Sequence, residues 1–330
     1  MADAIPHEHA STRESGRGRH AQKPHHIPLR GWKDILWRSW QELKENNIFL
    51  VTGGVTYAVL LALFPGLAAL VSLYGLVFDP SQVEQQVSAL SGVLPEQGQQ
   101  VLSSQLHSLA STSTRALGFS AIFSLLVALW SASRGMSGMI TALDIAYGQK
   151  DERSFIRFNL VAIALTLGLL VGGISAIALV AILPAVIGYL DLGAAATWAL
   201  LILEWPLLAG LVMLGLAVLY RYGPDRDEAQ WQWVSAGAIA ATVLWIISSI
   251  AFSIYVSNFA SYDKTYGSLG GAIVLLTWLY LSVFVTLLGA VINTQAERQT
   301  SSDTTEGQPR PMGRRDAFAA DTLGESSEKR

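Results

Sequence analysis

The segment FNLVAIALTLGLLVGGISAIALVAILPAVIGYL, residues 158–190, contains no charged side chain over 33 consecutive positions. About 20 apolar residues in a helix are enough to cross the hydrocarbon core of a bilayer. Only α-helices and closed barrels can satisfy every backbone hydrogen bond in that core. Barrel strands are short and alternate polar with apolar residues, a pattern that this segment lacks. The sequence therefore predicts a transmembrane α-helix at this position.

Five further segments have the same character. Hydrophobic residues make up 51% of the 330 residues and charged residues only 14%, whereas soluble domains contain about 25% charged residues. With no cysteine, the chain can form neither a disulfide nor a thiolate metal site. We predict an all-α fold, a polytopic membrane bundle with six transmembrane helices. The other five helices are expected in the runs 46–78, 116–133, 229–262 and 265–296, which are free of charge, and 192–220, which carries only Glu204.

The distribution of basic residues predicts the orientation of these helices. Lysine and arginine are enriched in the cytoplasmic connections of membrane proteins. With six spans, 20 of the 22 basic residues fall on one side of the membrane, and only Arg115 and Lys264 fall on the other. We therefore expect both termini to be cytoplasmic. The basic segments on that side are 1–47, 134–157, 221–228 and the tail from residue 298.

The segments outside the spans differ in composition. Residues 1–30 and 298–330 are poor in apolar and rich in polar residues, which is typical of disordered chain. We therefore predict two disordered cytoplasmic tails around a membrane domain of residues 31–297. Residues 79–115 form the one long external segment. It is predicted to be helical because Ser81 and Glu84 have the spacing of a capping box.

Residues 31–47 predict an amphipathic helix on the cytoplasmic side. Such a helix can lie in the membrane interface with its indoles at the level of the headgroups. It can equally pack against the cytoplasmic ends of the bundle, and the sequence leaves both alternatives open. The apolar face of this helix is formed by Trp32, Ile35, Leu36, Trp40 and Leu43.

Glu204 is the only ionisable residue deep inside a predicted span. At about 1.5 Å per residue from the outer end of its helix, it lies roughly 12 Å into a core about 30 Å thick. A carboxylate at that depth is costly unless it is protonated, paired or hydrated. Pro206 removes a backbone hydrogen bond from the same helix. The two residues indicate either an ion or proton pathway at a broken helix, or a neutral Glu that bonds to a neighbouring helix.

Two other prolines, Pro65 and Pro184, also fall inside predicted spans. Broken helices line substrate cavities in many transporters, but a proline can also produce a purely structural kink. We place Pro65 and Tyr57, both in the first span, in one candidate cavity or ion pathway with Glu204 and Pro206.

Polar clusters are expected at both edges of the membrane. On the cytoplasmic side, Arg134, Arg153 and Arg157 surround the 134–157 connection, near Asp144 and the turn at residues 220–224. These arginines could bind anionic lipid or a phosphate group, or could simply anchor helices in the interface. A candidate external mouth, which could also be an ordinary aromatic belt, consists of Tyr262, Asp263, Lys264 and Tyr266.

Several short motifs occur between the first span and the last. They are GVTYA at 54–58 with LFP at 63–65, WSASRGM at 130–136, ALDIAY at 142–147, YRYGP at 220–224, YDKTYGSLG at 262–270, WLY at 278–280 and GAVIN at 289–293. In this order along the chain, they resemble the motifs of the YihY/BrkB family of bacterial inner-membrane proteins. The resemblance covers residues 31–297 and implies a six-span protein of the bacterial inner membrane. Family members have carried the label ribonuclease BN, and branches are associated with serum resistance and with envelope lipid or lipopolysaccharide handling.

Three functions are weighed on this basis. The leading hypothesis is transport or flipping of a small or lipidic, envelope-related substrate. The alternative is a non-transporting scaffold that holds lipids or partners through its cytoplasmic arginines and amphipathic helix. A nuclease is disfavoured, because metal-dependent hydrolysis needs clustered His and carboxylate ligands and residues 31–297 contain one histidine, His107.

These hypotheses carry expectations about partners. We expect no enzymatic activity, no cofactor, no bound metal and no nucleic-acid partner. The expected partners are membrane lipids and a small-molecule or lipid substrate, and a homo-oligomer stays open.

Overall fold

The computed structural model describes residues 16–75, 119–189, 194–258 and 269–327. The predicted external segment at 79–115 and the candidate external mouth lie outside these residues. Within them, the secondary structure is helical, apart from one isolated bridge between Ala229 and Thr305. The all-α prediction is confirmed for the part of the chain that the structure describes.

Long apolar helices form the body of the molecule. Five of them are long and apolar enough to cross a membrane, whereas α6 is not among these five. The five candidate spans agree with a multi-pass membrane protein. The remaining one of the six predicted spans corresponds to α6. The long helices of the described residues are α3 (Ile48–Gly75), α6 (Phe119–Tyr147), α7 (Phe155–Tyr189), α8 (Ala194–Tyr222), α9 (Trp231–Asn258) and α11 (Leu269–Glu297).

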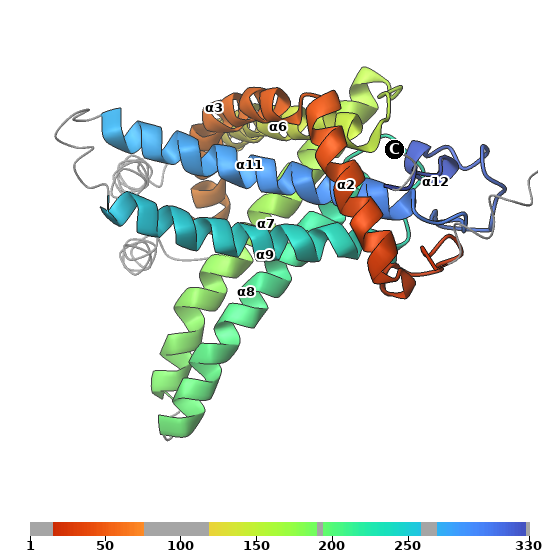
Figure 1. Cartoon of the computed structure of the whole chain (residues 1–330). Helices are drawn as coiled ribbons and strands as arrows, with labels where there is room; N and C mark the ends of the chain where they lie inside the picture. The colour runs from red at the N-terminus through yellow and green to blue at the C-terminus, as the bar shows by residue number, and fades with distance from the viewer. Residues whose placement is uncertain (1–15, 76–118, 190–193, 259–268, 328–330) are drawn as a thin grey trace, which may run out of the picture.

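The helices are arranged around α11, which packs against α9, α3 and α6. Helix α3 packs along α6, and α7 and α8 form a hairpin that contacts α6 and α9. Figure 1 shows this hairpin running obliquely away from the other long helices. Because little of the surface of α7 and α8 is covered by other helices, their apolar side chains are left for the hydrocarbon phase.

The contact between α9 and α11 depends on two glycines. Gly237 of α9 lies against Gly289 and Asn293 of α11, and a Cβ at Gly237 would collide with both. The backbone N–H of Gly237 donates to Asn293 Oδ1 at 2.6 Å, and Asn293 Nδ2 donates to the carbonyl of Val234 at 3.2 Å. Small residues let helix backbones approach closely enough for such polar contacts. This contact fixes how α9 and α11 pack.

Replacing Gly237 by alanine tests this close approach. Overpacking a tight contact costs typically about 1–3 kcal/mol, so we expect Gly237→Ala to lower the Tm of the purified protein by several degrees. The matched control is Gly210→Ala in α8, where a Cβ meets no atom within 4 Å. Equal Tm values for the two variants would contradict the packing described here.

The structure corrects two expectations about the spans. The predicted span ends at residue 133, but the helix that contains it, α6, continues through Arg134 to Tyr147. Only residues 148–154 of the predicted 134–157 connection are therefore non-helical. The prolines do not break their helices either: α3 continues through Pro65 and α8 through Pro206. A single internal proline removes one hydrogen bond, and the neighbouring turns of a long apolar helix maintain the helical backbone.

The structure also differs from the expectation of disordered tails. Residues 16–28 and 298–327 pack against α2 (Leu29–Glu45) and the end of α11, and include the short helices η1 (Pro24–His26) and α12 (Phe318–Asp321). We call this assembly the terminal cap. Arg17 donates two hydrogen bonds to Asp34 at 2.9 and 2.7 Å. Composition predicts disorder here because few residues are apolar, but the cap is held by buried polar contacts.

One buried ion pair connects the end of α11 to the turn after α8. Arg226 donates to both carboxylate oxygens of Glu297 at 2.9 and 2.7 Å, and the two side chains are 1% and 0% exposed. Thr304 Oγ1, in the C-terminal segment, donates to the same carboxylate at 2.7 Å. The pair therefore also holds the C-terminal segment in place.

Removing this carboxylate should destabilise the cap. Glu297→Gln leaves the Arg226 guanidinium buried without its counterion, and breaking a buried pair in this way costs about 3–5 kcal/mol. We expect a large fall in Tm and faster proteolysis after residue 298. Glu306→Gln is the control, because Glu306 is 58% exposed in its pair with Arg221 and exposed pairs contribute about 0–1 kcal/mol. Comparable losses in both variants would contradict the assignment.

Candidate functional site

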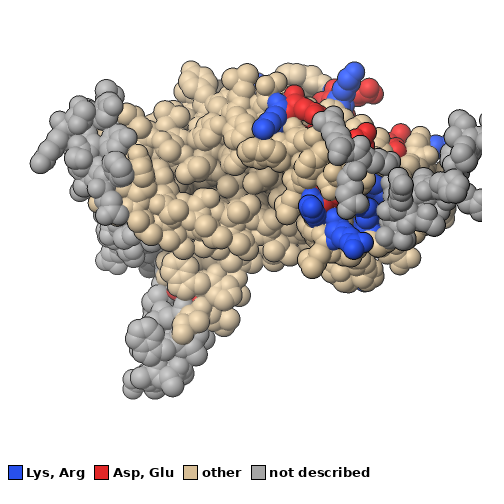
Figure 2. Space-filling model, in the orientation of Figure 1, with Lys and Arg blue, Asp and Glu red and all other residues tan. Residues whose placement is uncertain are grey.

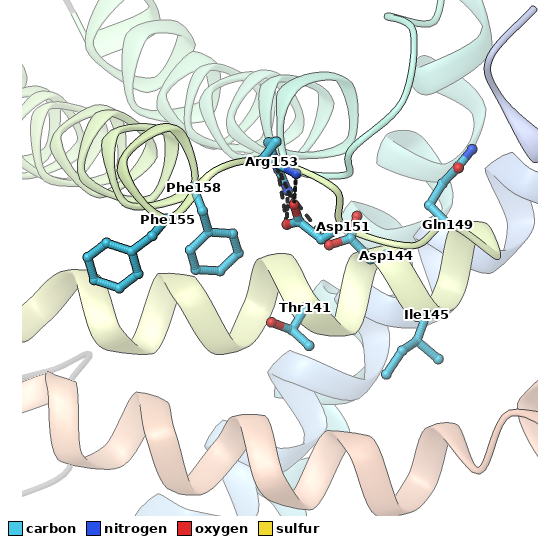
Figure 3. Close-up of a pocket in the computed structure, with 8 residues that line it drawn as sticks. All are labelled: Thr141, Asp144, Ile145, Gln149, Asp151, Arg153, Phe155 and Phe158. Atoms are coloured by element: carbon cyan, nitrogen blue, oxygen red, sulfur yellow. Dashed lines mark hydrogen bonds and ion pairs between the residues drawn. The ribbon is translucent and has the colours of Figure 1, made fainter.

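A cavity of about 460 Å³ lies where α6 ends and α7 begins (Figure 3). Its wall combines carboxylates, one arginine and two phenyl rings, contributed by the last turns of α6, the connector and the first turn of α7. Apolar and charged surface therefore meet in one place, as is common in ligand sites. The lining residues are Thr141, Asp144, Ile145, Gln149, Asp151, Arg153, Phe155 and Phe158.

Arg153 is the centre of the charged wall. Its Nε and Nη2 donate to the Asp151 carboxylate at 3.0 and 2.6 Å, and Nη1 donates to the carbonyl of Gly223 at 3.0 Å. Carboxylate oxygens of Asp144 and Asp225 each lie 3.7 Å from the guanidinium. The Arg153 side chain is only 4% exposed. One buried cation thus faces three carboxylates and connects the α6–α7 connector to the α8–α9 turn.

Local sequence explains the shape of the connector. Gly148 ends α6 with a φ of +65°, a conformation that glycine adopts without strain. The N–H of Gln149 then donates back to the carbonyl of Asp144 at 2.8 Å. Asp151 Oδ1 accepts the backbone N–H of Arg153 at 3.0 Å, which closes a tight turn before α7. The connector is therefore fixed by its own residues as well as by the guanidinium.

The two oxygens of Asp144 have different surroundings. Oδ1 accepts the backbone N–H of Asp225 at 2.7 Å. Oδ2 is buried and accepts no hydrogen bond from the described residues, and the same holds for Gln149 Nε2 as a donor. The Asp144 side chain is 6% exposed. Next to the cavity, a carboxyl oxygen and an amide nitrogen are thus buried without a hydrogen-bond partner among the described residues.

The carboxyl groups of the site titrate in different ranges. Burial raises the pKa of Asp144 to about 7, because the loss of water outweighs the Asp225 hydrogen bond and the attraction of Arg153. Burial also raises the pKa of Asp151, but the hydrogen bonds from Arg153 outweigh it, so this pKa lies below its ordinary value. Asp144 therefore holds a proton at higher pH than Asp151, which is paired with Arg153.

The raised pKa of Asp144 predicts a pH dependence of stability. The folded protein holds this proton more tightly than the unfolded chain does, so the contribution is complete below about pH 4 and is lost as pH rises through about 7. We expect the Tm of the wild type to fall between pH 5 and pH 8. The slope should be smaller in Asp144→Asn, which keeps the Oδ1 acceptor and cannot ionise. Parallel Tm–pH curves for the two proteins would count against a titrating Asp144.

The residues of the predicted cavity lie elsewhere in the structure. Tyr57 and Pro65 lie on α3, whereas Glu204 and Pro206 lie on α8, and these two helices pack mainly on other neighbours. Tyr57 and Pro206 are exposed, and Glu204 and Pro65 are half-buried. The structure does not bring the four together around the 460 Å³ cavity.

The three predicted arginines have different environments. Arg153 lies in the cavity wall and its guanidinium is occupied by protein groups. Arg134 is exposed on α6, 4.6 Å from the centre of the Trp130 ring. Arg157 is exposed in the first turn of α7, where its backbone N–H lies 3.4 Å from Ser154 Oγ. The 134–157 connection singled out in the sequence therefore forms part of the cavity wall. The guanidinium of Arg153, however, is paired with carboxylates of the protein and is not exposed to an anionic ligand.

Sequence reasoning missed part of the site. It did not single out Asp225, which lies 81 residues from Asp144 in the sequence, nor the two phenylalanines at the start of α7. The Asp151–Arg153 spacing was the available local signal, since an aspartate two residues before an arginine can form a turn with it.

Comparison with known proteins identifies the family. The family model described as virulence factor BrkB matches residues 39–313. The chain belongs to the BrkB family. The match includes the whole cavity but, of the two terminal segments of the cap, only residues 298–313. The cavity is therefore a feature of the BrkB-family part of the chain.

Relatives of this BrkB-family chain carry two kinds of name. It is 33% identical over 251 residues, 72% of this chain and 86% of the relative, to the ribonuclease-like protein YfkH of Bacillus subtilis. It is 24% identical over 280 residues, 80% of this chain and 95% of the relative, to a UPF0761 membrane protein of Idiomarina loihiensis. A UPF0761 membrane protein of Pseudoalteromonas translucida is 24% identical over 270 residues, 79% of this chain and 85% of the relative. No solved structure matches the chain.

Proposed function

We propose that this membrane protein moves a small or lipidic, envelope-related substrate across the bacterial inner membrane, and that the cavity at Asp144 binds the polar part of that substrate. In this proposal the chain has six spans and both termini are cytoplasmic. Helix α6 supports the sixth span, because it packs along α3, one of the five candidate spans. The excess of basic residues on one side supports the orientation.

The observation that carries the proposal is the mixed character of the cavity. Asp144 Oδ2 and Gln149 Nε2 are buried without hydrogen-bond partners among the described residues, and the rings of Phe155 and Phe158 line the other side of the cavity (Figure 3). Unpaired buried polar groups are rare because each one is costly. A molecule with a polar head and an apolar portion could satisfy both kinds of surface at once.

The position of the cavity supports a lipidic substrate. It lies at the base of α7, the helix that begins the oblique hairpin (Figure 1). Phe155 and Ile156, at the start of this helix, are exposed, and so are many apolar residues along the hairpin. A lipid-like molecule could therefore approach the cavity from the side, with its chain against the apolar surface.

The titration of Asp144 supports coupling of movement to protons. A carboxyl group with a pKa of about 7 changes charge in the range of bacterial cytoplasmic pH. Protonation removes one negative charge from a cluster of three carboxylates around Arg153, which changes the attraction for a charged head group. The cavity wall would then bind a charged substrate with different affinities below and above about pH 7.

Lipid movement in proteoliposomes tests this proposal. Vesicles with a head-labelled fluorescent phosphatidylglycerol and an impermeant reductant report the fraction of label that crosses the bilayer. We expect the wild type to move the probe and Asp144→Asn to slow it by at least about tenfold, a loss of about 1.4 kcal/mol. Glu152→Gln is the matched control, because Glu152 is exposed and contributes only its backbone N–H to the cluster.

Two results would count against the proposal: no probe movement by the wild type, or equal rates in the wild type and Asp144→Asn. Glu204→Gln in the same assay tests whether the half-buried carboxylate of α8 takes part. A full rate in that variant would remove Glu204 from the pathway and leave the cavity at Asp144 as the site.

The alternative function, a scaffold without transport, would leave the cavity occupied by a retained lipid and would give no flux. We do not include enzymatic activity in the proposal. The word ribonuclease-like belongs to the Bacillus relative, and the one histidine of residues 31–297 in this chain offers little for the metal-dependent hydrolysis of a phosphodiester.

A further inference from the structure

Helix α2 lies on the side of the bundle and crosses α11 (Figure 1). Its inner face is buried against α11 and the terminal cap. Ile35 and Leu43 supply the apolar contacts, and Arg38 donates to Gln295 and Gln299. Because α11 is a candidate span, a helix that crosses it runs roughly in the plane of the membrane, near the cytoplasmic end of the spans.

The opposite face of α2 is uncovered and partly apolar. Leu29, Leu36 and Trp40 are 88%, 57% and 55% exposed. These residues lie within a narrow stripe, since a helix turns about 100° per residue. This stripe is not the apolar face expected from the sequence, because Ile35 and Leu43 point inward while Leu36 and Trp40 point outward.

Cations alternate with these apolar residues. Lys33 and Lys44 are exposed on the same side, and Lys44 Nζ lies 4.8 Å from the centre of the Trp40 ring. Figure 2 shows the charged side chains, Lys and Arg together with Asp and Glu, gathered at this end of the molecule, whereas the rest of the described surface in this view is largely uncharged. We call Leu29, Lys33, Leu36, Trp40 and Lys44 the outer face of α2.

The acidic residues of α2 lie away from this face. Asp34 is buried against Arg17, and Glu42 accepts a hydrogen bond from Asn46 and lies 3.8 Å from Arg298. Glu45 follows Lys44 by one residue and is therefore rotated by about 100° around the helix. The outer face presents two lysines and no carboxylate.

We propose that the outer face of α2 binds the headgroups of anionic phospholipids in the cytoplasmic leaflet. Leu29, Leu36 and Trp40 enter the boundary between headgroups and acyl chains, and the lysines reach the phosphates on flexible stems. An indole beside an ammonium group suits this boundary, where one side is apolar and the other is hydrated. Charge complementarity selects anionic over zwitterionic lipid.

An acidic protein segment would fit these observations less well. It could pair with the cations, but it would leave Leu29 and Leu36 against water or require an apolar partner of its own. A lipid leaflet supplies both surfaces at the level where the helix lies. Lipid binding by the outer face of α2 does not require transport by the protein.

Quenching of Trp40 by brominated lipids tests the proposal in the intact protein. The full-length chain is placed in nanodiscs that contain either brominated phosphatidylglycerol or brominated phosphatidylcholine in otherwise equal amounts. The difference between the wild type and Trp40→Phe isolates the signal of this one indole. We expect phosphatidylglycerol to quench that signal about twofold more than phosphatidylcholine does, because anionic lipid is enriched beside the lysines.

Variants of the lysines provide the control. Lys33→Gln with Lys44→Gln should reduce the ratio of the two quenching signals to about one. Lys23→Gln with Lys150→Gln, which changes two exposed lysines outside this face, should leave the ratio unchanged. Equal quenching by the two lipids in the wild type, absence of quenching by either, or an equal effect of the control pair would overturn the proposal. Absence of quenching would indicate that a protein partner or water covers the face.

Discussion

The hydrocarbon core of the membrane tolerates no unpaired polar group, and the organisation of this protein follows from that constraint. The backbone of each long segment must be helical, and ionisable side chains are concentrated at one end of the described helices. At that end the charged side chains are packed and hydrogen-bonded within the protein. Arg153, Arg226 and Arg38 each lie in a buried network that joins segments far apart in the sequence. The apolar helices and the concentration of charge at one end thus both follow from the low polarity of the hydrocarbon core.

The same constraint explains why the candidate site is at the polar end of the helices. A group of three carboxylates and one guanidinium would be very costly deep in hydrocarbon. Where α6 and α7 meet, backbone N–H groups and a buried arginine can compensate for most of this charge. The compensation is incomplete at Asp144 Oδ2, and this oxygen belongs to the group with the raised pKa. Geometry and titration therefore point to the same atom.

The sequence was sufficient for the helices and only partly sufficient for the site. Long runs without charge predict spans because no other structure satisfies their backbone. Arg134 was taken as the end of a span, yet α6 continues through it, since one exposed arginine beside Trp130 does not stop a helix. Asp144 and Arg153 were visible as a polar cluster. Their relation to Asp225 was not, because pairing between distant segments leaves no periodic signal. The sequence predicted disorder in the two tails because they contain few apolar residues. In the described parts of these tails, buried arginines, threonines and glutamines form the interior of the cap instead.

The terminal cap brings together residues 16–45 and residues 298–327, which lie far apart in the sequence. Asp34 in α2 accepts hydrogen bonds from Arg17 and from the backbone N–H and hydroxyl of Ser327, and Arg38 donates to the carbonyl of Glu325. Arg17 precedes α2 in the chain, whereas Glu325 and Ser327 are synthesised only after the long helices have been made. Asp34 and Arg38 therefore lack their C-terminal partners while these helices enter the membrane, so the cap can close only after α11 is in place.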